Sequence, residues 1–245
     1  MFDISGKLGV QSWCFRNFKP LDQLIAQVKA LGLSRLELCG VHADFENEAG
    51  FAAVLAPFQQ AGITITSIGV QYFSGTPNEE KWFAFAQQAG CSMISTSFRV
   101  DNTPASIKTT EKLAEKYGLL LGIHNHGGYD WLGNEGMINY VLKNASPRLG
   151  MCIDTAWCIQ AGHDPMKMAE RFRDRLFGTH IKDFTFNSAG KWSDVVVGTG
   201  NLKLKEYLAF VQATPSCKSI TLEYEGDVVN PLPKLLECVE MIKAC

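Results

Sequence analysis

Residues 61–70 read AGITITSIGV, and the same arrangement returns 28 residues later as AGCSMISTSF (89–98) and again as YGLLLGIH (117–124). Each copy has a glycine at the end of a helical pattern, followed at once by a short apolar or β-branched run. Glycine tolerates the left-handed conformation that ends many helices, so each copy predicts a helix that stops and a strand that starts. The segment LGLSRLEL (31–38) fits the same plan.

Runs of this kind begin at eight places, and the intervals between them are regular. Successive starts lie 27 to 30 residues apart, except for a final interval of 41. Such an interval accommodates one strand, one crossover helix and two short loops, which is typical of repeated βα units. The predicted strands begin near Leu8, Arg35, Ile63, Cys91, Leu119, Leu149, Leu176 and Cys217.

Amphipathic segments fill the intervals between the strands. Leu24, Val28 and Leu31 share one helical face in the first interval. In the fourth interval, Thr103 followed by Pro104 is typical of a helix N-cap and first turn, so we expect a helix to begin there.

Eight parallel strands can form an open, doubly wound sheet or a closed barrel. No GxGxxG fingerprint follows the first strand, where an open nucleotide-binding sheet often carries one. Polar residues occur at the C-terminal ends of many strands rather than at one switch point, which favours closure. The length of 245 residues suits one barrel, and no linker divides the chain. We therefore expect an α/β fold, a single (β/α)₈ TIM barrel domain over residues 1–245.

Charge and composition restrict the expected partners. The 23 Lys and Arg residues are balanced by 25 Asp and Glu residues, which gives a net charge of -2. This charge provides no broad attraction for nucleic acid or an anionic membrane, so we expect neither partner. The N-terminal segment lacks a signal-peptide pattern and no apolar run approaches the length of a membrane span, so a cytoplasmic protein is expected. A homodimer remains an open alternative to a monomer.

Eight cysteines would suit a small disulfide-rich secreted domain, but this chain is large enough to fold without such bridges. No CxxC pair occurs. We expect Cys39, Cys91, Cys152 and Cys217 to act as reduced, small apolar residues.

The last four predicted strands all end in polar residues. In a barrel the carboxyl ends of the strands form the functional rim, and residues of one parity face the same side. His124 and His126 therefore share an orientation, as do His180 and Lys182. The four strand ends are LLLGIHNHGG (119–128), LGMCIDTAW (149–157), LFGTHIKDF (176–184) and ITLEYEGD (220–227).

A metal ion is the economical explanation of this convergence. Asp154 follows the apolar run GMCI, where a lone carboxylate needs a partner to stay ionised. We expect Asp154 and His180 to coordinate the metal, whereas His126 is either a ligand or a supporting hydrogen-bonding group. Glu223 and Glu225 share a parity and compete for one role. Imidazole and carboxylate ligands suit Mn²⁺, Co²⁺, Zn²⁺ or Mg²⁺.

Residues near earlier strand ends are candidates for substrate contacts. Glu37 and His42 either reach the pocket or pair at its edge. The aromatic side chains of Trp13, Phe73 and Trp157 would give a sugar an apolar wall, unless they pack into the core.

The longest interval between strands contains NSAGKWSDVVVGTG (187–200), rich in glycine and small polar residues. We expect a loop here, either a lid over the active face or a solvated excursion.

With these residues in place, the chain resembles the xylose isomerase-like barrel superfamily, in particular the group of sugar phosphate isomerases and epimerases. The resemblance covers essentially the whole chain. It rests on IHNHGG (123–128), DTAWCIQAGHDP (154–165), GTHIKD (178–183) and LEYEGD (222–227), together with GVQSWCF (9–15) and RLEL (35–38).

The resemblance implies one divalent metal, with Mn²⁺ expected first. In that family the ligands are a Glu, an Asp, a His and a Glu on strands five to eight. Asp154 and His180 match directly, and Glu223 is the expected ligand on strand eight, with Glu225 as a rival that would otherwise bind substrate. His124 stands where the family has its strand-five Glu, so one glutamate of the usual two-glutamate epimerase mechanism is missing.

The resemblance further implies a metal-dependent isomerase or epimerase of a keto sugar or sugar-like polyol, which removes the proton next to a carbonyl that the metal polarises. His126, which matches the His of ENH-type relatives, or Glu223 would be the base, and Lys182 matches a lysine that contacts substrate. Expelling water or a glycosyl group instead would make the enzyme a lyase or dehydratase. An abasic-site endonuclease and a non-catalytic sugar-binding barrel are the remaining alternatives.

Overall fold

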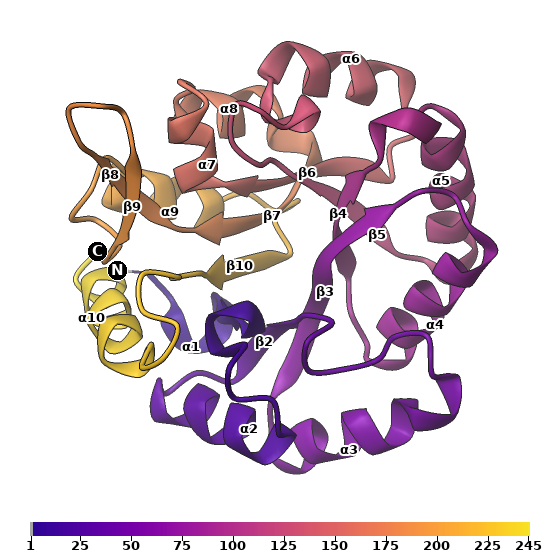
Figure 1. Ribbon diagram of the computed structural model, residues 1–245, viewed down its shortest axis with the longest axis horizontal. Coiled ribbons are helices and arrows are strands. Elements are labelled where there is room, and N and C mark those ends of the chain that lie inside the picture. The colour runs from indigo at the N-terminus through magenta and orange to yellow at the C-terminus, as the bar shows by residue number, and fades with distance from the viewer. Residues whose placement is uncertain (1) are drawn as a thin grey trace.

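The centre of the computed structural model, which describes residues 2–245, is a closed barrel of eight parallel strands (Figure 1). The order around the barrel is β1-β10-β7-β6-β5-β4-β3-β2, and β1 closes it by pairing with both β10 and β2. The barrel strands are β1 (Leu8–Gln11), β2 (Arg35–Leu38), β3 (Thr64–Phe73), β4 (Met93–Phe98), β5 (Leu120–His124), β6 (Leu149–Asp154), β7 (Leu176–Ile181) and β10 (Ser219–Leu222).

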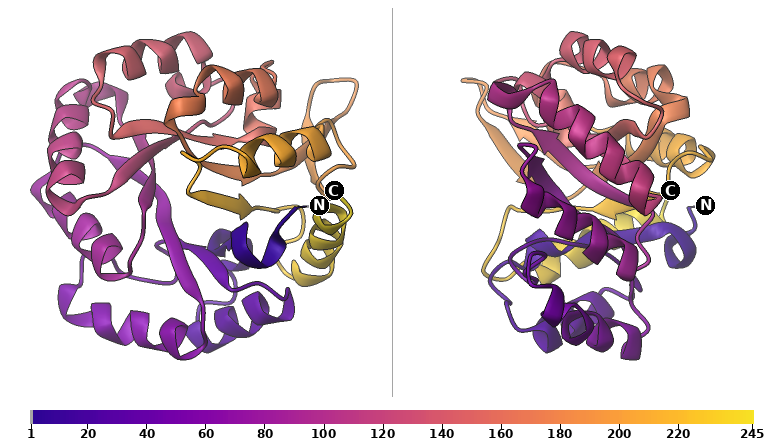
Figure 2. Two further views of the ribbon diagram at one scale, coloured as in Figure 1. Left: turned by 180° about the vertical axis from the view of Figure 1, so that it is seen from behind. Right: turned by 90° about the vertical axis from the view of Figure 1, so that its right-hand side faces the viewer.

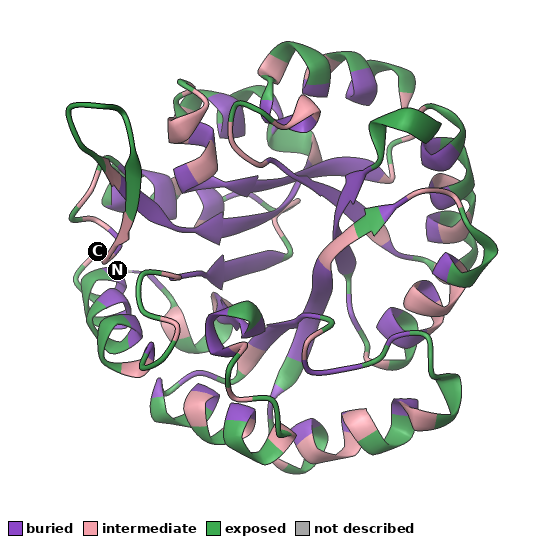
Figure 3. Ribbon diagram, viewed as in Figure 1, coloured by how far each residue is buried: buried purple, intermediate pink, exposed green. Residues whose placement is uncertain are grey.

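This architecture confirms the predicted (β/α)₈ barrel, and every barrel strand begins within two residues of its predicted start. Most strand residues are buried, whereas the helices are buried on the side that packs on the barrel and exposed on the other (Figure 3). A parallel sheet covered on both faces requires this pattern, because no strand face meets water.

Helices form a ring outside the barrel (Figure 1). The glycines predicted to end helices, Gly32, Gly62, Gly90 and Gly118, all have φ between 70° and 75°, which confirms the left-handed turn into the next strand. The helices are α1 (Ile4–Lys7), α2 (Leu21–Ala30), α3 (Phe51–Gln60), α4 (Glu80–Gln88), α5 (Ala105–Tyr117), α6 (Glu135–Asn144), α7 (Thr155–Gln160), α8 (Pro165–Arg171), α9 (Leu204–Gln212) and α10 (Leu232–Lys243).

The predicted N-cap at Thr103 was wrong. Helix α5 begins at Ala105, and Pro104 rather than Thr103 occupies the N-cap position. The hydroxyl of Thr103 donates instead to the carbonyl of Arg99 at 2.9 Å, so it closes the preceding turn and is not free to cap the helix.

A small apolar cluster of Met93, Cys152 and Phe177 connects strands β4, β6 and β7. Two glycines make room for it: a Cβ atom added at Gly122 or Gly178 would lie within 3.0 Å of the Met93 side chain. Since Asp154 and His180 follow Cys152 and Gly178 by two residues on the same strands, this packed cluster supports the functional residues at the strand ends.

The segment predicted as a loop, residues 187–200, is not all loop, because it contains strand β9 (Trp192–Val195). This strand pairs antiparallel with β8 (Asp183–Phe186) in a hairpin between β7 and β10. Figure 2 shows, in its right-hand view, this hairpin and the N-terminus at opposite ends of the barrel. The hairpin directly follows the carboxyl end of β7, so it stands on the functional rim.

All eight cysteines are free, in agreement with the expectation of reduced thiols, although Cys217 is only partly buried. Among the helices of residues 2–245, none combines the length and the apolar character that a membrane span requires.

Candidate functional site

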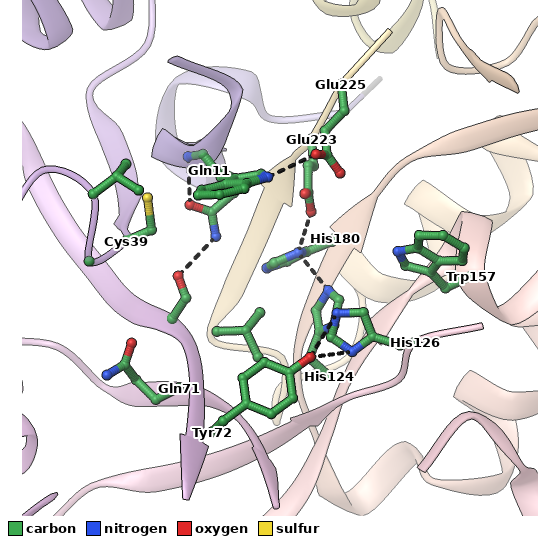
Figure 4. A pocket seen from close by; sticks show the side chains of 15 residues that line it. Gln11, Cys39, Gln71, Tyr72, His124, His126, Trp157, His180, Glu223 and Glu225 are labelled. Carbon is green, nitrogen blue, oxygen red and sulfur yellow. Dashed lines mark hydrogen bonds and ion pairs between the residues drawn. The ribbon is translucent and has the colours of Figure 1, made fainter. Parts of the chain in front are cut away.

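Four buried side chains from the ends of four neighbouring barrel strands converge: His124, Asp154, His180 and Glu223. One possible ligand atom from each lies within 4.8 Å of the others. The Nε2 atom of His124 lies 3.0 Å from Nδ1 of His180 and 3.5 Å from Oδ2 of Asp154. Figure 4 shows His180 between His124 and Glu223. The structure thus brings together the four residues that the sequence predicted as metal ligands.

Asp154 is held in place by its own helix and by the neighbouring strand. Its Oδ1 accepts a hydrogen bond from the backbone N–H of Trp157 at 2.8 Å, which caps α7. The side chain of Asn125 exchanges two hydrogen bonds of 3.0 Å with the Asp154 backbone. The other carboxylate oxygen, Oδ2, is buried and has no hydrogen-bond partner among residues 2–245. Because a buried carboxylate oxygen without a partner is costly, this oxygen marks the expected position of a cation.

The four donors fit one divalent cation. Imidazole nitrogens and carboxylate oxygens bind such ions at about 2.0–2.2 Å, so two ligand atoms on one ion lie roughly 3–4 Å apart. The separations of 3.0 and 3.5 Å around His124 and of 2.7 Å between His180 and Glu223 are close to this range. The two carboxylates, Asp154 and Glu223, balance two positive charges. A set of two nitrogens and two oxygens suits Zn²⁺, Co²⁺ or Mn²⁺.

His180 uses both ring nitrogens. Its Nδ1 faces Glu223 at 2.7 Å, and its Nε2 lies 2.9 Å from Oε1 of Glu37. Glu37 is fully buried and also accepts hydrogen bonds from Gln11, at 2.7 Å, and from the hydroxyl of Ser67. A carboxylate behind a histidine fixes both the orientation and the tautomer of the ring, so that the opposite nitrogen can bind a metal.

The charges in this region shift several ionisation equilibria. Burial opposes the charged form of His180, but the carboxylate of Glu37 and hydrogen bonds to Cys152 and Glu223 hold the His180 pKa well above its ordinary value. For Glu223, burial is outweighed by Lys182 and His180, which hold its pKa well below the ordinary range. Without a metal, His180 is therefore a charged imidazolium between the carboxylates of Glu37 and Glu223. A metal that binds this ring would have to displace one of its two ring protons.

Lys182 lies beside the ligand cluster and is almost completely buried. Its Nζ contacts Glu225 Oε1, and it lies 3.4 Å from Glu223 Oε1 and 3.6 Å from Asp194 Oδ2. Burial opposes its charge, but Glu223 and the other carboxylates keep the Lys182 pKa well above the ordinary value. Lys182 does not line the cavity described below. Its contacts show it as the cation that holds together the two carboxylates after β10, Glu223 and Glu225.

Glu223 and Glu225, rivals in the sequence, differ clearly in the structure. Glu223 faces His180, whereas Glu225 is occupied by protein partners on both oxygens: Lys182 on Oε1, and the indole N–H of Trp13 (2.8 Å) and Arg16 (3.2 Å) on Oε2. Only Glu223 of the two belongs to the four-residue cluster.

His126 lies next to the cluster, with its ring centroid 4.7 Å from that of His124. Its ring nitrogens are 3.2 and 3.3 Å from the hydroxyl of Tyr72 (Figure 4). Burial, and next the charge of His124, lower the His126 pKa to about 3. His126 is therefore a neutral imidazole over the physiological range, with a nitrogen available to accept a proton.

A cavity of about 450 Å³ opens above the cluster, a volume typical of small-molecule sites. Trp13, Tyr72 and Trp157 form aromatic parts of its wall, as predicted for the two tryptophans. Its lining consists of Gln11, Trp13, Cys39, Gly40, Val41, Gly69, Val70, Gln71, Tyr72, His124, His126, Trp157, His180, Glu223 and Glu225.

The aromatic residue on β3 that faces the cavity is Tyr72, whereas Phe73 takes the alternative of core packing that the sequence left open. Phe73 is fully buried and packs against Trp82, Phe83 and Phe98. The register of β3 against β4 shifts between Ile68 and Gln71, and such an irregularity reverses which residues point inward.

The predicted substrate contact of Glu37 finds no support in the geometry, because Glu37 lies behind His180 and does not line the cavity. His42 is likewise buried at the edge, where its ring lies 3.7 Å from the Cys39 sulfur and 3.3 Å from the Phe15 carbonyl.

Sequence reasoning missed Asp194, which the hairpin brings to the site. Its side chain is 3% exposed, accepts the backbone N–H of Glu225 at 3.1 Å, and lies next to Lys182. The same hairpin packs Trp192 against Trp157, with ring centroids 5.1 Å apart. The signal for these contacts in the sequence was the pair Trp192 and Asp194 in KWSDV (191–195). The surrounding segment, rich in glycine and small polar residues, is otherwise typical of a loop.

Comparisons with known proteins agree with the fold. A curated relative, 3-oxo-isoapionate decarboxylase of Pectobacterium atrosepticum, is 31% identical over 93 residues, a match that covers 36% of this chain and only 33% of that protein. The structure of 3-keto-D-glucoside 4-epimerase from E. coli is 15% identical over 98% of this chain and 99% of that chain, with a TM-score of 0.76. The IOLI protein, crystallised with a zinc atom, is 13% identical over 97% and 98%, with a TM-score of 0.74.

The profile of a family described as xylose isomerase-like TIM barrel matches residues 25–245. This range includes the four clustered residues and every barrel strand after the first. The chain belongs to the xylose isomerase-like TIM barrel family.

Proposed function

We propose that the chain is a divalent-metal-dependent isomerase or epimerase that moves a proton next to the carbonyl of a keto sugar or sugar-like polyol. The observation that carries this proposal is the cluster of His124, Asp154, His180 and Glu223 at the base of a cavity that also exposes His126. These four residues would hold the metal, with Mn²⁺ the first expectation. The zinc atom in the IOLI protein supports a metal in this fold and leaves Zn²⁺ as an alternative.

A bound divalent ion would polarise the substrate carbonyl and so acidify the neighbouring C–H bond. His126 is the favoured base, because it lines the cavity, is neutral, and has the neutral Tyr72 hydroxyl rather than a charged group as the partner of its ring nitrogens. Glu223 is less suited, since Oε2 contacts His180 and Oε1 faces Lys182. Negative charge that develops on the substrate would raise the proton affinity of His126 at the moment of transfer.

The other residues would position these groups. Lys182 fixes the carboxylates of Glu223 and Glu225, and Glu37 orients His180. Trp13 and Trp157 would contact the apolar faces of a sugar ring and exclude water. Returning the proton from His126 to the neighbouring carbon on the same face would give isomerisation, whereas epimerisation would need a second group, such as Glu223, to deliver a proton to the opposite face. The activity of the E. coli epimerase of the same fold supports this outcome.

A lyase is the second candidate, and one feature favours it. His124 replaces the expected strand-five glutamate, so the second glutamate of the usual two-glutamate mechanism, which would return a proton from the other face, is missing from the cluster. Loss of a leaving group needs just one base. The partial match to a decarboxylase, which also breaks a bond next to a carbonyl, supports this reading.

Solvent-deuterium exchange tests both candidates. Protein loaded with Mn²⁺ is incubated in D₂O with a panel of ketoses and 3-keto-glycosides, and the products are read by NMR and mass spectrometry. An isomerase or epimerase yields an isomer that carries deuterium next to the carbonyl, whereas a lyase yields a product that has lost water or a glycosyl group. Asp154→Asn and His180→Ala should abolish metal binding and exchange. His163→Asn is the matched control, because His163 pairs with Glu135 outside the site. Absence of exchange with every compound would defeat the proposal.

A further inference from the structure

The charge on the cavity wall restricts the substrate. Fifteen residues line the cavity, and none of them is lysine or arginine (Figure 4). The lining carries two carboxylates, Glu223 and Glu225. Proteins recognise phosphate and carboxylate groups mainly through arginine forks, lysines or helix N-termini, which supply charge-assisted hydrogen bonds.

Two cations beside the cavity, Lys182 and Arg16, are already neutralised. Lys182 is 1% exposed and contacts Glu223, Glu225 and Asp194. Arg16 binds Glu225 at 3.2 Å and the Trp13 carbonyl at 3.0 Å. To pair with either of these two cations, an anionic substrate would have to displace a carboxylate, which would leave that carboxylate unpaired.

Neither the expected metal nor the nearest helix end adds a free positive charge to the cavity wall. The charge of a divalent ion in the cluster would be balanced by Asp154 and Glu223. The N-terminus of α7 is capped by Asp154 itself, whose Oδ1 accepts the Trp157 N–H, so it presents no vacant backbone donor at that position.

The same wall suits uncharged hydroxyl groups. Gln71 and Tyr72 offer neutral polar atoms, while Trp13 and Trp157 offer aromatic surface to C–H faces. We propose that this site takes an uncharged keto sugar, with neither a phosphate nor a carboxylate group. That the substrate has a keto group rests on the proposed function. That it has no phosphate or carboxylate group rests on the charges of the cavity wall. A phosphate group in this cavity would lose its water without gaining a lysine or arginine partner from the wall.

Paired ligands test the inference. Wild-type protein loaded with Mn²⁺ is titrated calorimetrically with D-fructose, D-tagatose and D-psicose, and with the 6-phosphate of each. 5-Keto-D-gluconate serves as the carboxylate probe. Deuterium exchange is measured for the same compounds. We expect at least one free ketose to bind and exchange, with an affinity and a kcat/KM at least roughly tenfold above those of its phosphate ester and of the acid, because burying an unpaired charge costs at least the free energy that a tenfold change represents.

A variant that adds a cation to the cavity wall provides a second test of the inference. Gln71→Arg should raise the affinity for the phosphate esters relative to the free sugars, whereas Gln71→Met, a control of similar size without charge, should not. The outcomes separate the two proposals. Equal or tighter binding of an ester or of the acid by wild-type protein overturns the charge inference even if exchange occurs. Binding of a free ketose without exchange of any compound overturns the proposed function and leaves the inference standing. Binding of no compound counts against both.

Discussion

The Nε2 atom of His180 lies 2.9 Å from Oε1 of Glu37, a residue 143 positions earlier in the chain, while Nδ1 of the same ring faces Glu223 at 2.7 Å. Two buried carboxylates thus hold one imidazole from opposite sides. If the cluster binds a metal, Glu37 accepts a hydrogen bond from the Nε2–H group and leaves Nδ1 as the coordinating atom.

Replacing Glu37 by glutamine should therefore weaken metal binding without removing a ligand. The amide of the Glu37→Gln variant keeps the shape of the side chain but loses the charge that favours the Nε2–H tautomer of His180. We expect the affinity for Mn²⁺ or Zn²⁺ to fall about 10- to 100-fold, the usual effect of losing such an outer partner. Isothermal titration of the metal-free protein measures this change.

Glu79→Gln is the matched control for this experiment. Glu79 is also a buried carboxylate, but its hydrogen bonds go to Ser74 and Gly75 in the loop after β3. Its replacement should lower stability in the same way but leave the metal affinity unchanged. An unchanged affinity in Glu37→Gln would show that Glu37 does not position His180.

The sequence predicted the barrel well because the signals for it are local. A glycine that ends a helix and a β-branched run that starts a strand lie next to each other in the chain, as at Gly62 and Gly90. The four clustered residues could be predicted for a related reason, since each lies at the end of its own strand and parallel strands align those ends.

The contacts that the sequence did not reveal depend on distant parts of the chain. Tyr72 replaces Phe73 on the cavity wall because of the register shift in β3, which depends on pairing with β4. Asp194 reaches Lys182 only because β9 folds back on β8. Glu37 was placed near the site correctly, but its depth behind His180 depends on how β2 and β7 lie across the barrel.

The histidine at position 124 should influence which metal binds. His124→Glu would restore the glutamate that the family resemblance implies and replace a nitrogen ligand by a harder oxygen ligand. We expect the ratio of the Mn²⁺ to the Zn²⁺ affinity to rise by about tenfold, or about 1.4 kcal/mol, because imidazole favours Zn²⁺ more than carboxylate does. Competition titrations with both metals measure the ratio. A ratio that moves toward Zn²⁺ would mean that position 124 does not coordinate.

His126 should act in the chemical step and not in metal binding. His126→Asn should lower the exchange rate by about 10²- to 10⁴-fold, the usual contribution of a general base, with metal content unchanged. Tyr72→Phe, which removes just the hydroxyl next to the ring, should have a smaller effect.

The pH profile provides an independent test of His126. Because burial and His124 lower its pKa to about 3, the ring stays neutral above that pH and remains able to accept a proton. The loss of activity on acidification near pH 6.5 that an ordinary histidine base would cause should be absent. A wild-type profile that falls near pH 6.5, with that fall removed in His126→Asn, would contradict this assignment of its protonation state.

Asp194 should make the stability of the metal-free protein depend on pH. Burial raises its pKa from 3.8 to about 7, against the opposing effects of Lys182 and the Glu225 N–H. Between these two values the folded protein holds a proton that the unfolded chain has lost, so this group lowers the free energy of unfolding as the pH rises from about 4 to 7. Asp194→Asn removes the titration. The melting temperature of the variant, relative to wild type, should therefore increase with pH over this window and level off above it.

Each pKa unit corresponds to about 1.4 kcal/mol, and each kcal/mol shifts the melting temperature of a chain of this size by about 2–4 °C, so the relative change should be readily measured. Asp101→Asn, in an exposed turn, is the control and should track wild type at every pH. If attraction to Lys182 outweighed burial, the Asp194 pKa would lie below 3.8, and the relative melting temperature of Asp194→Asn would fall with rising pH only below about pH 4 and stay level from about pH 4 to 7. Whether the relative melting temperature rises or stays level between about pH 4 and 7 therefore decides whether the hairpin carboxylate is a charged partner of Lys182 in the metal-free site or a protonated group that its buried position keeps neutral.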